Sequence, residues 1–223
     1  MGQAKLRQPL SRDRVLRAAV AVADRDGIEA LTMRRLAEEV GAEAMSLYHH
    51  VANKQQILDG VIEVVLGEVN EAVGALRLPS RGAAWKAAVR ARALTARQVF
   101  LRHPWAPAVL ESRTTPLPAV LIYHDGVAGL LRDGGFTYDQ IHHALHALGS
   151  RALGFTQELF DPGGGPAADL ALPPEVADAL PNLAAMLAGV AHDEPASTLG
   201  WCDDQAEFEF GLDLLLDGLD RLR

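Results

Sequence analysis

The chain has 223 residues, of which 49% are hydrophobic and only 5% aromatic, and its formal net charge is −8. A core of Ala, Leu and Val favours helices over strands, and the single cysteine, Cys202, excludes an internal disulfide and a paired-cysteine metal site. No apolar run reaches the ~20 residues that span a bilayer, and residues 1–10 lack the apolar segment of a signal peptide, so we expect a soluble, cytoplasmic protein.

Charge is distributed unevenly along the chain. Residues 1–60 carry 9 Lys and Arg against 8 Asp and Glu, whereas residues 61–223 carry 12 against 21. Near the N-terminus one acidic residue, Asp13, accompanies five basic ones, Lys5, Arg7, Arg12, Arg14 and Arg17. An acidic body with a basic N-terminal end would orient on a polyanion by that end.

Four helices are predicted in the N-terminal third, because apolar residues recur at helical spacing over about 11–26, 32–40, 44–50 and 53–76. Ser11 and Thr32 are suitable N-caps, since their hydroxyls can accept from unpaired backbone N–H groups. Gly27 and Gly41 fit the position after a helix end, where φ is positive.

Six further helices are predicted, over about 82–103, 105–112, 119–133, 137–160, 174–189 and 204–222. Thr137 and Gln140 have the spacing of a capping box. The Gly-rich stretch 161–173 is predicted to be a loop, and it does not resemble a phosphate-binding loop because it follows no strand and contains no GKS or GKT. Since no strand or repeat is found, the predicted fold class is all-α with about nine or ten helices.

Residues 27–60 carry the pattern with the clearest functional meaning. Two short helices that are joined by a Gly-containing turn and packed on a longer helix describe a helix-turn-helix. Its second short helix enters the major groove of DNA, while the first crosses the backbone. The expected core between these helices is Leu36, Ala37, Val40, Leu47 and Val51, and the expected outward or rim positions are Ala44, Met45, Ser46, Tyr48, His49 and His50.

The same stretch resembles the DNA-binding domain of the TetR family of bacterial regulators, closest to the tetracycline-repressor branch. Its most specific part is LYHHVANK, from Leu47 to Lys54. The resemblance is strong over 11–65, and RHPW at 102–105 and the GGF before the capping box look like the C-terminal domain of that branch. The other matching residues are Gly27, Leu31, Thr32, Arg34, Leu36, Ala37, Val40, Gly41 and Leu58.

The resemblance implies a DNA-binding domain over 1–65 and a helical ligand-binding and dimerisation domain over 66–223. It implies a base contact for Arg34 and base-reading positions at Ala44, Met45 and Ser46. It implies phosphate contacts for Thr32, Tyr48, His50 and Lys54, with His49 between the two groups.

Simpler interpretations of these residues stay open. Tyr48 could mainly pack, His50 could cap the third helix, and one of the adjacent Arg34 and Arg35 is expected to be merely solvated because they face different ways. Ala44 and Met45 have no strong hydrogen-bonding group and would contact thymine methyls. Specificity would then depend on Arg34, Ser46, the N-terminal arm and DNA shape.

A largely apolar effector pocket is expected in the body, although each lining candidate could equally be plain core. The candidates are Trp85, Val89, Phe100, His103, Trp105, Leu121, His124, His146, Phe155 and Trp201. His142 and His146 are four residues apart, with His143 beside them, but no matching carboxylate accompanies them, so we expect no metal and no cofactor. Asn70 and Ser150 stand where the tetracycline branch grips its drug–magnesium complex with histidines, which argues against tetracycline.

Two amphipathic helices are candidates for a two-fold dimer interface. Their apolar faces could instead be intramolecular core. The candidate interface residues are Ile141, Leu145, Leu148, Phe208, Leu212, Leu215, Leu216 and Leu219.

The sequence therefore predicts a homodimeric repressor that a small-molecule effector releases from a double-stranded DNA operator. One alternative is a helical protein-interaction regulator without a small ligand. An all-helical enzyme is the other alternative, but HExxH, GxSxG and a nucleophile–base pair are missing from the sequence.

Overall fold

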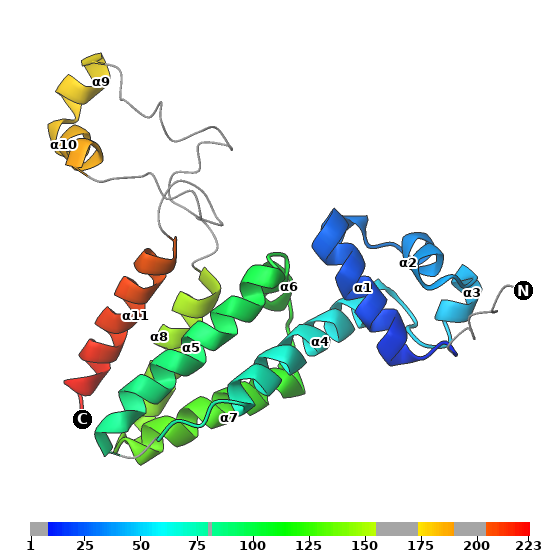
Figure 1. The fold of residues 1–223 in the computed structure, drawn as a ribbon, viewed down its shortest axis with the longest axis horizontal. Coiled ribbons are helices and arrows are strands. Elements are labelled where there is room, and N and C mark those ends of the chain that lie inside the picture. Colours follow the sequence, from blue (N-terminus) through cyan, green and yellow to red (C-terminus); the bar gives the residue numbers. More distant parts are fainter. Residues whose placement is uncertain (1–8, 80–81, 155–173, 190–203) are drawn as a thin grey trace, which may run out of the picture. The chain divides into compact units, whose positions relative to one another are not determined.

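The computed structural model describes residues 9–79, 82–154, 174–189 and 204–223. These residues form helices and connecting segments without a strand, which confirms the predicted all-α class (Figure 1). The elements are α1 (Arg12–Asp26), η1 (Ile28–Ala30), α2 (Met33–Val40), α3 (Ala44–Leu47), α4 (Lys54–Gly74), η2 (Gly82–Ala84), α5 (Trp85–Arg102), α6 (Ala106–Glu111), α7 (Pro118–Asp133), α8 (Tyr138–Gly154), α9 (Pro174–Ala179), α10 (Pro181–Gly189) and α11 (Asp204–Asp220).

The helix starts and stops in the N-terminal part follow the predicted local signals. Ser11 Oγ accepts from the N–H of Arg14 at 3.2 Å, and Thr32 Oγ1 accepts from that of Arg35 at 3.2 Å. Gly27 and Gly41 have φ of +84° and +66°, which a residue with a Cβ adopts only with strain. Because of these caps, α1 and α2 begin and end where the sequence predicts.

The third helix is shorter than predicted. It ends at Leu47 rather than His50, because the N–H groups of His50 and Val51 both bond to the Leu47 carbonyl, at 2.8 and 2.9 Å, in a closing turn. The chain then becomes extended at Asn53, whose side chain accepts from the Gln56 N–H at 2.9 Å and begins α4.

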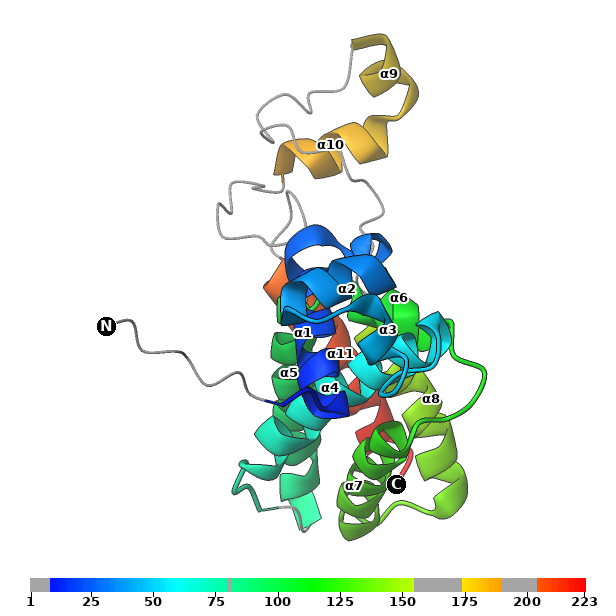
Figure 2. The same ribbon diagram turned by 90° about the vertical axis from the view of Figure 1, so that its right-hand side faces the viewer.

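Helix α4 is the central helix of the first compact unit, which comprises residues 1–145 and Arg223. It packs against α1 in its first part and against α5, α6 and α7 further along. In Figures 1 and 2, α1, α2 and α3 form one group at the start of α4. One continuous hydrophobic core runs from Val15 through Val69 to Leu117. The predicted domain boundary at residue 65 falls inside α4 and stays a prediction.

The remaining helices belong largely to a second unit, residues 146–222. The capping box at the start of α8 is confirmed, since Thr137 N donates to Gln140 Oε1 at 2.8 Å and Gln140 N donates to Thr137 Oγ1 at 3.3 Å. The single helix predicted over 174–189 is wrong. It is split into α9 and α10 before Pro181, which has no N–H and fits the first position of a new helix.

That split explains why the described ranges hold eleven α-helices rather than nine or ten. The predicted loop over 161–173 and the end of the helix predicted to reach residue 160 lie outside the described residues.

Candidate nucleic-acid interface

The turn between α2 and α3 has the geometry of a helix-turn-helix. Gly41 lies in the left-handed region at φ +66°, ψ +39°, and the next N–H, of Ala42, closes on the Ala37 carbonyl at 3.0 Å. The predicted small core between the helices is confirmed, because each of its members is at most 7% exposed: Leu36, Ala37, Val40, Leu47 and Val51.

The side chains predicted to face DNA are accessible around α3. Met45 is 73% exposed and Tyr48 is 46% exposed. His49 is also exposed, while Ala44, Ser46 and His50 are partly exposed. The arrangement leaves this short helix able to enter a groove, and the roles of the individual residues stay predictions.

Arg34 and Arg35 face different ways, as expected for adjacent helix positions. The Arg34 side chain is 91% exposed, and among the described residues its ion-pair partner is Glu38, four residues on, at 3.2 Å. Arg35 Nη2 instead bonds to Asp26 Oδ2 at 3.0 Å. Arg34 is therefore the more accessible of the two, and a single exposed ion pair holds it weakly.

Arg35 belongs to a charged network that ties α2 to the end of α1. Arg25 donates to Asp26 and, at 2.9 Å, to Glu39. Hydrogen bonds from Arg25 and Arg35 hold the pKa of Asp26 below its ordinary value, and the bond from Arg25 does the same for the pKa of Glu39. The network orients the helix that precedes the reading helix.

Two predicted phosphate contacts lie at helix N-termini. Thr32 uses its oxygen to cap α2, which leaves its O–H able to donate to a phosphate. Lys54 opens α4, is 56% exposed and lies 3.9 Å from Glu29. The unpaired N–H groups and dipole of a helix start favour an anion.

Asp24 joins α1 to the segment after α5, a contact that the sequence pattern did not reveal. Its Oδ1 accepts from Trp105 Nε1 at 2.7 Å and lies 2.8 Å from His103 Nδ1. His103 Nε2 lies 3.4 Å from Glu68 of α4, which also pairs with Arg102. The RHPW motif therefore holds the helix-turn-helix group to α5, with the polar atoms of both aromatic residues engaged.

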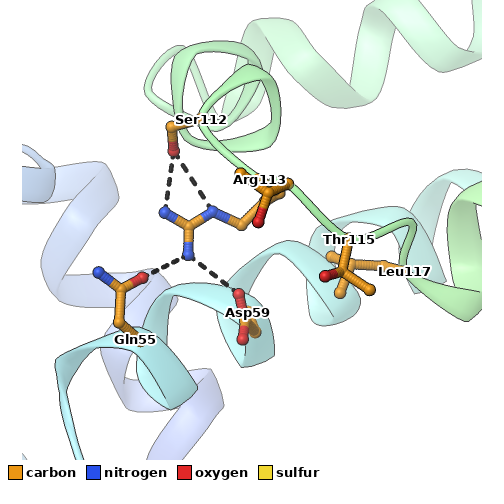
Figure 3. Close-up of a pocket in the computed structure, with 7 residues that line it drawn as sticks. Gln55, Asp59, Ser112, Arg113, Thr115 and Leu117 are labelled. Atoms are coloured by element: carbon orange, nitrogen blue, oxygen red, sulfur yellow. Dashed lines mark hydrogen bonds and ion pairs between the residues drawn. The ribbon is translucent and has the colours of Figure 1, made fainter.

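A cavity of about 580 Å³ lies where the segment after α6 passes the first turns of α4 (Figure 3). Arg113 reaches across it, with Nη1 2.7 Å from Gln55 Oε1 and 3.0 Å from Asp59 Oδ1. Its Nη2 also donates to Ser112 Oγ at 3.0 Å. This second junction was not predicted, because no local motif marks it.

The described pocket candidates on and just after α5 are spread along that helix. Trp85 is fully buried against Phe136 at the start of α5, with ring centroids 4.7 Å apart. Phe100, His103 and Trp105 lie at the other end of this 18-residue helix, about 25 Å away by helical rise. Which of the predicted residues line an effector pocket stays a prediction.

The other pocket candidates differ in exposure. Val89 is 2% exposed, whereas Leu121 is 55% exposed. His146 is exposed and His124 is partly buried. Phe155 and Trp201 lie outside the described residues.

The three histidines of α8 lie at the surface. His142 and His143 are exposed, like His146. Within the ranges that the structure covers, no group of three or more His, Cys, Asp or Glu side chains is placed to hold a metal ion.

Most of the predicted interface residues are buried within the chain. Ile141, Phe208, Leu212, Leu216 and Leu219 are at most 7% exposed. Leu145, Leu148 and Leu215 are partly exposed. The exposed large apolar residues of α11 are Phe210 and Leu214, at 64% and 55%.

This geometry defines a helix-turn-helix regulator of transcription with an attached helical body, and comparison with known proteins agrees. Residues 15–61 match the family model for bacterial regulatory proteins of the tetR family, and residues 78–223 match the model for the tetracyclin repressor-like C-terminal domain. The chain belongs to the TetR family of DNA-binding transcriptional regulators, as its sequence indicated.

Three similar proteins illustrate the relationship. An HTH-type transcriptional regulator of Saccharopolyspora erythraea is 35% identical over 153 residues, which are 68% of this chain but only 62% of that protein. The HTH-type transcriptional repressor DrrR1 of Streptomyces coeruleorubidus is 31% identical over 96% of this chain and 78% of its own length. The crystal structure of the Streptomyces coelicolor TetR family protein ActR with (S)-DNPA has a TM-score of 0.71 and 27% identity, covering 96% of this chain and 98% of that one.

These relatives are regulators, and no family of enzymes is indicated. None of the helices in the described ranges has the length and apolar character needed to traverse a membrane.

Proposed function

We propose that this chain is a cytoplasmic homodimeric repressor that leaves its operator when a small molecule binds in the helical body. The observation that carries the proposal is the continuity of α4. This one helix begins at the Asn53 cap, shortly after the reading helix, and packs against both α5 and α7. A shift of α4 in the body therefore moves the DNA-reading group.

In the proposed complex, α3 lies in the major groove. Arg34 and Ser46 donate to base edges, and Ala44 and Met45 contact thymine methyl groups. Thr32, Tyr48, His50 and Lys54 hold phosphates, and His49 reaches either. The exposure of Met45, Tyr48 and Arg34 supports these roles.

Two chains would place their reading helices on successive major grooves, roughly 34–36 Å apart. A residue must be accessible on one chain to contact another. Of the predicted interface set we therefore keep Leu145, Leu148 and Leu215, and we add the exposed Phe210 and Leu214 of α11.

Release requires that the effector bind one arrangement of the helices more tightly than the other. Among the described residues, Asp24 of α1 bonds to Trp105 and lies beside His103, and Arg113 after α6 bonds to Asp59 in the first turns of α4. A ligand that repositions α5, α6 or α7 would change these contacts. ActR was solved with a small molecule bound, which supports an effector for this chain too.

The proposal is tested by selecting bound fragments from random duplex DNA with the purified protein. We expect one partly palindromic site, and an affinity that falls steeply with salt because phosphate contacts release counterions. A set of small molecules is then screened for a raised melting temperature and for release of the selected duplex. An absence of salt-sensitive duplex binding would overturn the proposal. DNA binding that no stabilising compound reverses would favour the protein-interaction alternative.

A further inference from the structure

The last turn of α2 has a charge pattern that is unfavourable at the end of a helix. It contains Glu38 and Glu39 and no basic residue. Cations stabilise the partial negative charge of a helix C-terminus, whereas carboxylates destabilise it, and the last four carbonyls of a helix have no partner within it. This end of α2 leads into the turn at Gly41, so a contact that compensates it lies beside the turn.

Arg14 of α1 supplies the missing cation. Its Nη2 donates to the Val40 carbonyl at 3.0 Å, although the two residues are 26 positions apart in the chain. Val40 is the final residue of α2, and Gly41 follows it in the left-handed region. The carbonyl that accepts from Arg14 is therefore the one directly before the turn of the helix-turn-helix.

The backbone bonds of the turn use earlier carbonyls of α2. Gly41 N donates to the Glu38 carbonyl at 3.2 Å, and Ala42 N donates to the Ala37 carbonyl at 3.0 Å. The Arg14 side chain satisfies a carbonyl beyond these two. Helix α3, which follows, has four residues and is too short to be stable as an isolated helix. Its orientation therefore depends on this turn and on packing.

Side chains link α1 to α2 at opposite ends of the two helices. Asp26, the last residue of α1, accepts from Arg35 near the start of α2 at 3.0 Å. Arg14, in the first turn of α1, donates to Val40 at the end of α2. Two attachments at opposite ends fix the direction of α2 along α1, whereas one attachment alone would leave α2 freer to rotate.

We infer that Arg14 is a positioning residue for DNA reading, because its guanidinium holds the end of α2, and with it α3, in the orientation that base contacts require. By charge alone Arg14 belongs to the basic group near the N-terminus, which would face a polyanion. Its Nη2 instead binds the backbone of α2, whereas Arg17 on the same helix is 67% exposed and pairs with Asp13. This inference deepens the proposed function and rests on it.

Base contacts and phosphate contacts respond differently to a misplaced reading helix. Contacts to base edges require a defined geometry and distinguish the operator from other duplexes. Phosphate contacts support non-specific binding, and its salt dependence reports how many phosphates are neutralised. Loss of a positioning residue therefore lowers the ratio of operator affinity to scrambled-duplex affinity. Loss of a phosphate contact lowers both affinities and the salt dependence.

The test measures this ratio for the full-length protein, with the selected operator and a scrambled duplex, over a range of salt concentrations. Arg14→Met keeps the aliphatic stem and removes the donor. We expect operator affinity to fall about tenfold, as for a lost hydrogen bond to a charged group, while the scrambled duplex binds as before with the same salt dependence. Arg14→Lys restores a cation and should recover part of the loss.

Arg17→Met is the matched control on α1. Its exposed pair with Asp13 contributes little, so the affinity ratio should stay at the wild-type value. Melting curves check that each variant is folded, and Arg14→Gln replaces Arg14→Met if the methionine variant unfolds.

Amide hydrogen exchange of the free protein tests the same contact without DNA. Exchange reports local opening, so Arg14→Met is expected to speed exchange over residues 41–47, and Arg17→Met is expected to leave it unchanged. If no operator can be selected, the proposed function fails, and the exchange measurement still tests whether Arg14 holds the turn.

Three results would overturn the inference. The first is a folded Arg14→Met protein in which the affinity ratio, or the exchange over residues 41–47, is that of the wild type. The second is an equal loss of affinity for both duplexes with a reduced salt dependence, which would make Arg14 a phosphate contact. The third is an Arg14→Lys protein as impaired as Arg14→Met, because the positive charge at the end of α2 would then have no role.

Discussion

Asp24 and Trp105 are 81 positions apart in the chain, yet Trp105 Nε1 donates to Asp24 Oδ1 at 2.7 Å. The same oxygen lies 2.8 Å from His103 Nδ1, and both aromatic residues are less than 10% exposed. One carboxylate on α1 therefore satisfies two buried groups that follow α5. This carboxylate thereby links α1 to the segment after α5.

Asp24→Ala is expected to destabilise the protein by about 1–3 kcal/mol, because it leaves the buried Trp105 and His103 donors without an acceptor. Urea unfolding measures the loss. Asp13→Ala is the control on the same helix, since the partner of Asp13 within the described ranges is the exposed Arg17, and such exposed pairs contribute little. Equal effects of the two substitutions would contradict a role for Asp24 as the anchor.

The contact between Arg113 and Asp59 predicts measurable coupling across the second junction. Arg113 is 13% exposed and Asp59 is 44% exposed, so we expect an interaction energy of about 1 kcal/mol in a double-mutant cycle with alanine at both positions. The same variants should alter the response of DNA binding to effector. Additive effects on unfolding would show that the pair is not coupled.

Substitutions of Arg34 and Arg35 are predicted to change different properties of the protein, namely affinity for DNA and stability. Arg34→Ala should weaken specific operator binding by about 1–3 kcal/mol if the side chain reads a base, with little change in melting temperature because it is exposed. Arg35→Ala should lower the melting temperature, because Arg35 bonds to Asp26. Gel shifts with specific and scrambled duplexes, with parallel melting curves, separate the two. An unchanged affinity of Arg34→Ala would remove it from the reading set.

The network around Asp26 and Glu39 predicts an acid-dependent stability. Both pKa values are lowered in the folded chain, so the unfolded chain binds more protons in acid. The stabilisation is complete above the ordinary carboxyl pKa values, about 4, and is lost as the pH falls through the lowered folded values. Asp26→Asn should therefore destabilise at pH 7 and have a smaller effect at pH 3, measured by urea unfolding. A difference that is independent of pH would contradict this.

The dimer proposal predicts that two leucines on α11 respond differently. Leu214 is 55% exposed and Leu216 is fully buried. Leu214→Arg is expected to give folded monomers in sedimentation, whereas Leu216→Arg is expected to disrupt folding. Gln98→Arg, at an exposed position on α5, should stay dimeric. A dimer that persists in Leu214→Arg would place the interface elsewhere.

Local sequence alone determined the helix class, the caps at Ser11, Thr32 and Thr137, and the turn at Gly41. These features depend on bonds within a few residues and on the steric freedom of glycine, so they can be recognised without a fold. The helix-turn-helix and its family follow from that local order. Pro181 is also a local signal, and it explains the break that the periodicity of 174–189 concealed.

Tertiary structure decided which partners the same residues meet. His103 and Trp105 have the composition of pocket residues, but packing placed them against Asp24, far away in the sequence. Burial of Leu212 and Leu216, and exposure of Phe210 and Leu214, likewise depend on what covers each face. An amphipathic pattern specifies that a face must be covered. Only the three-dimensional arrangement specifies which segment covers that face, because this depends on contacts between segments distant in the chain.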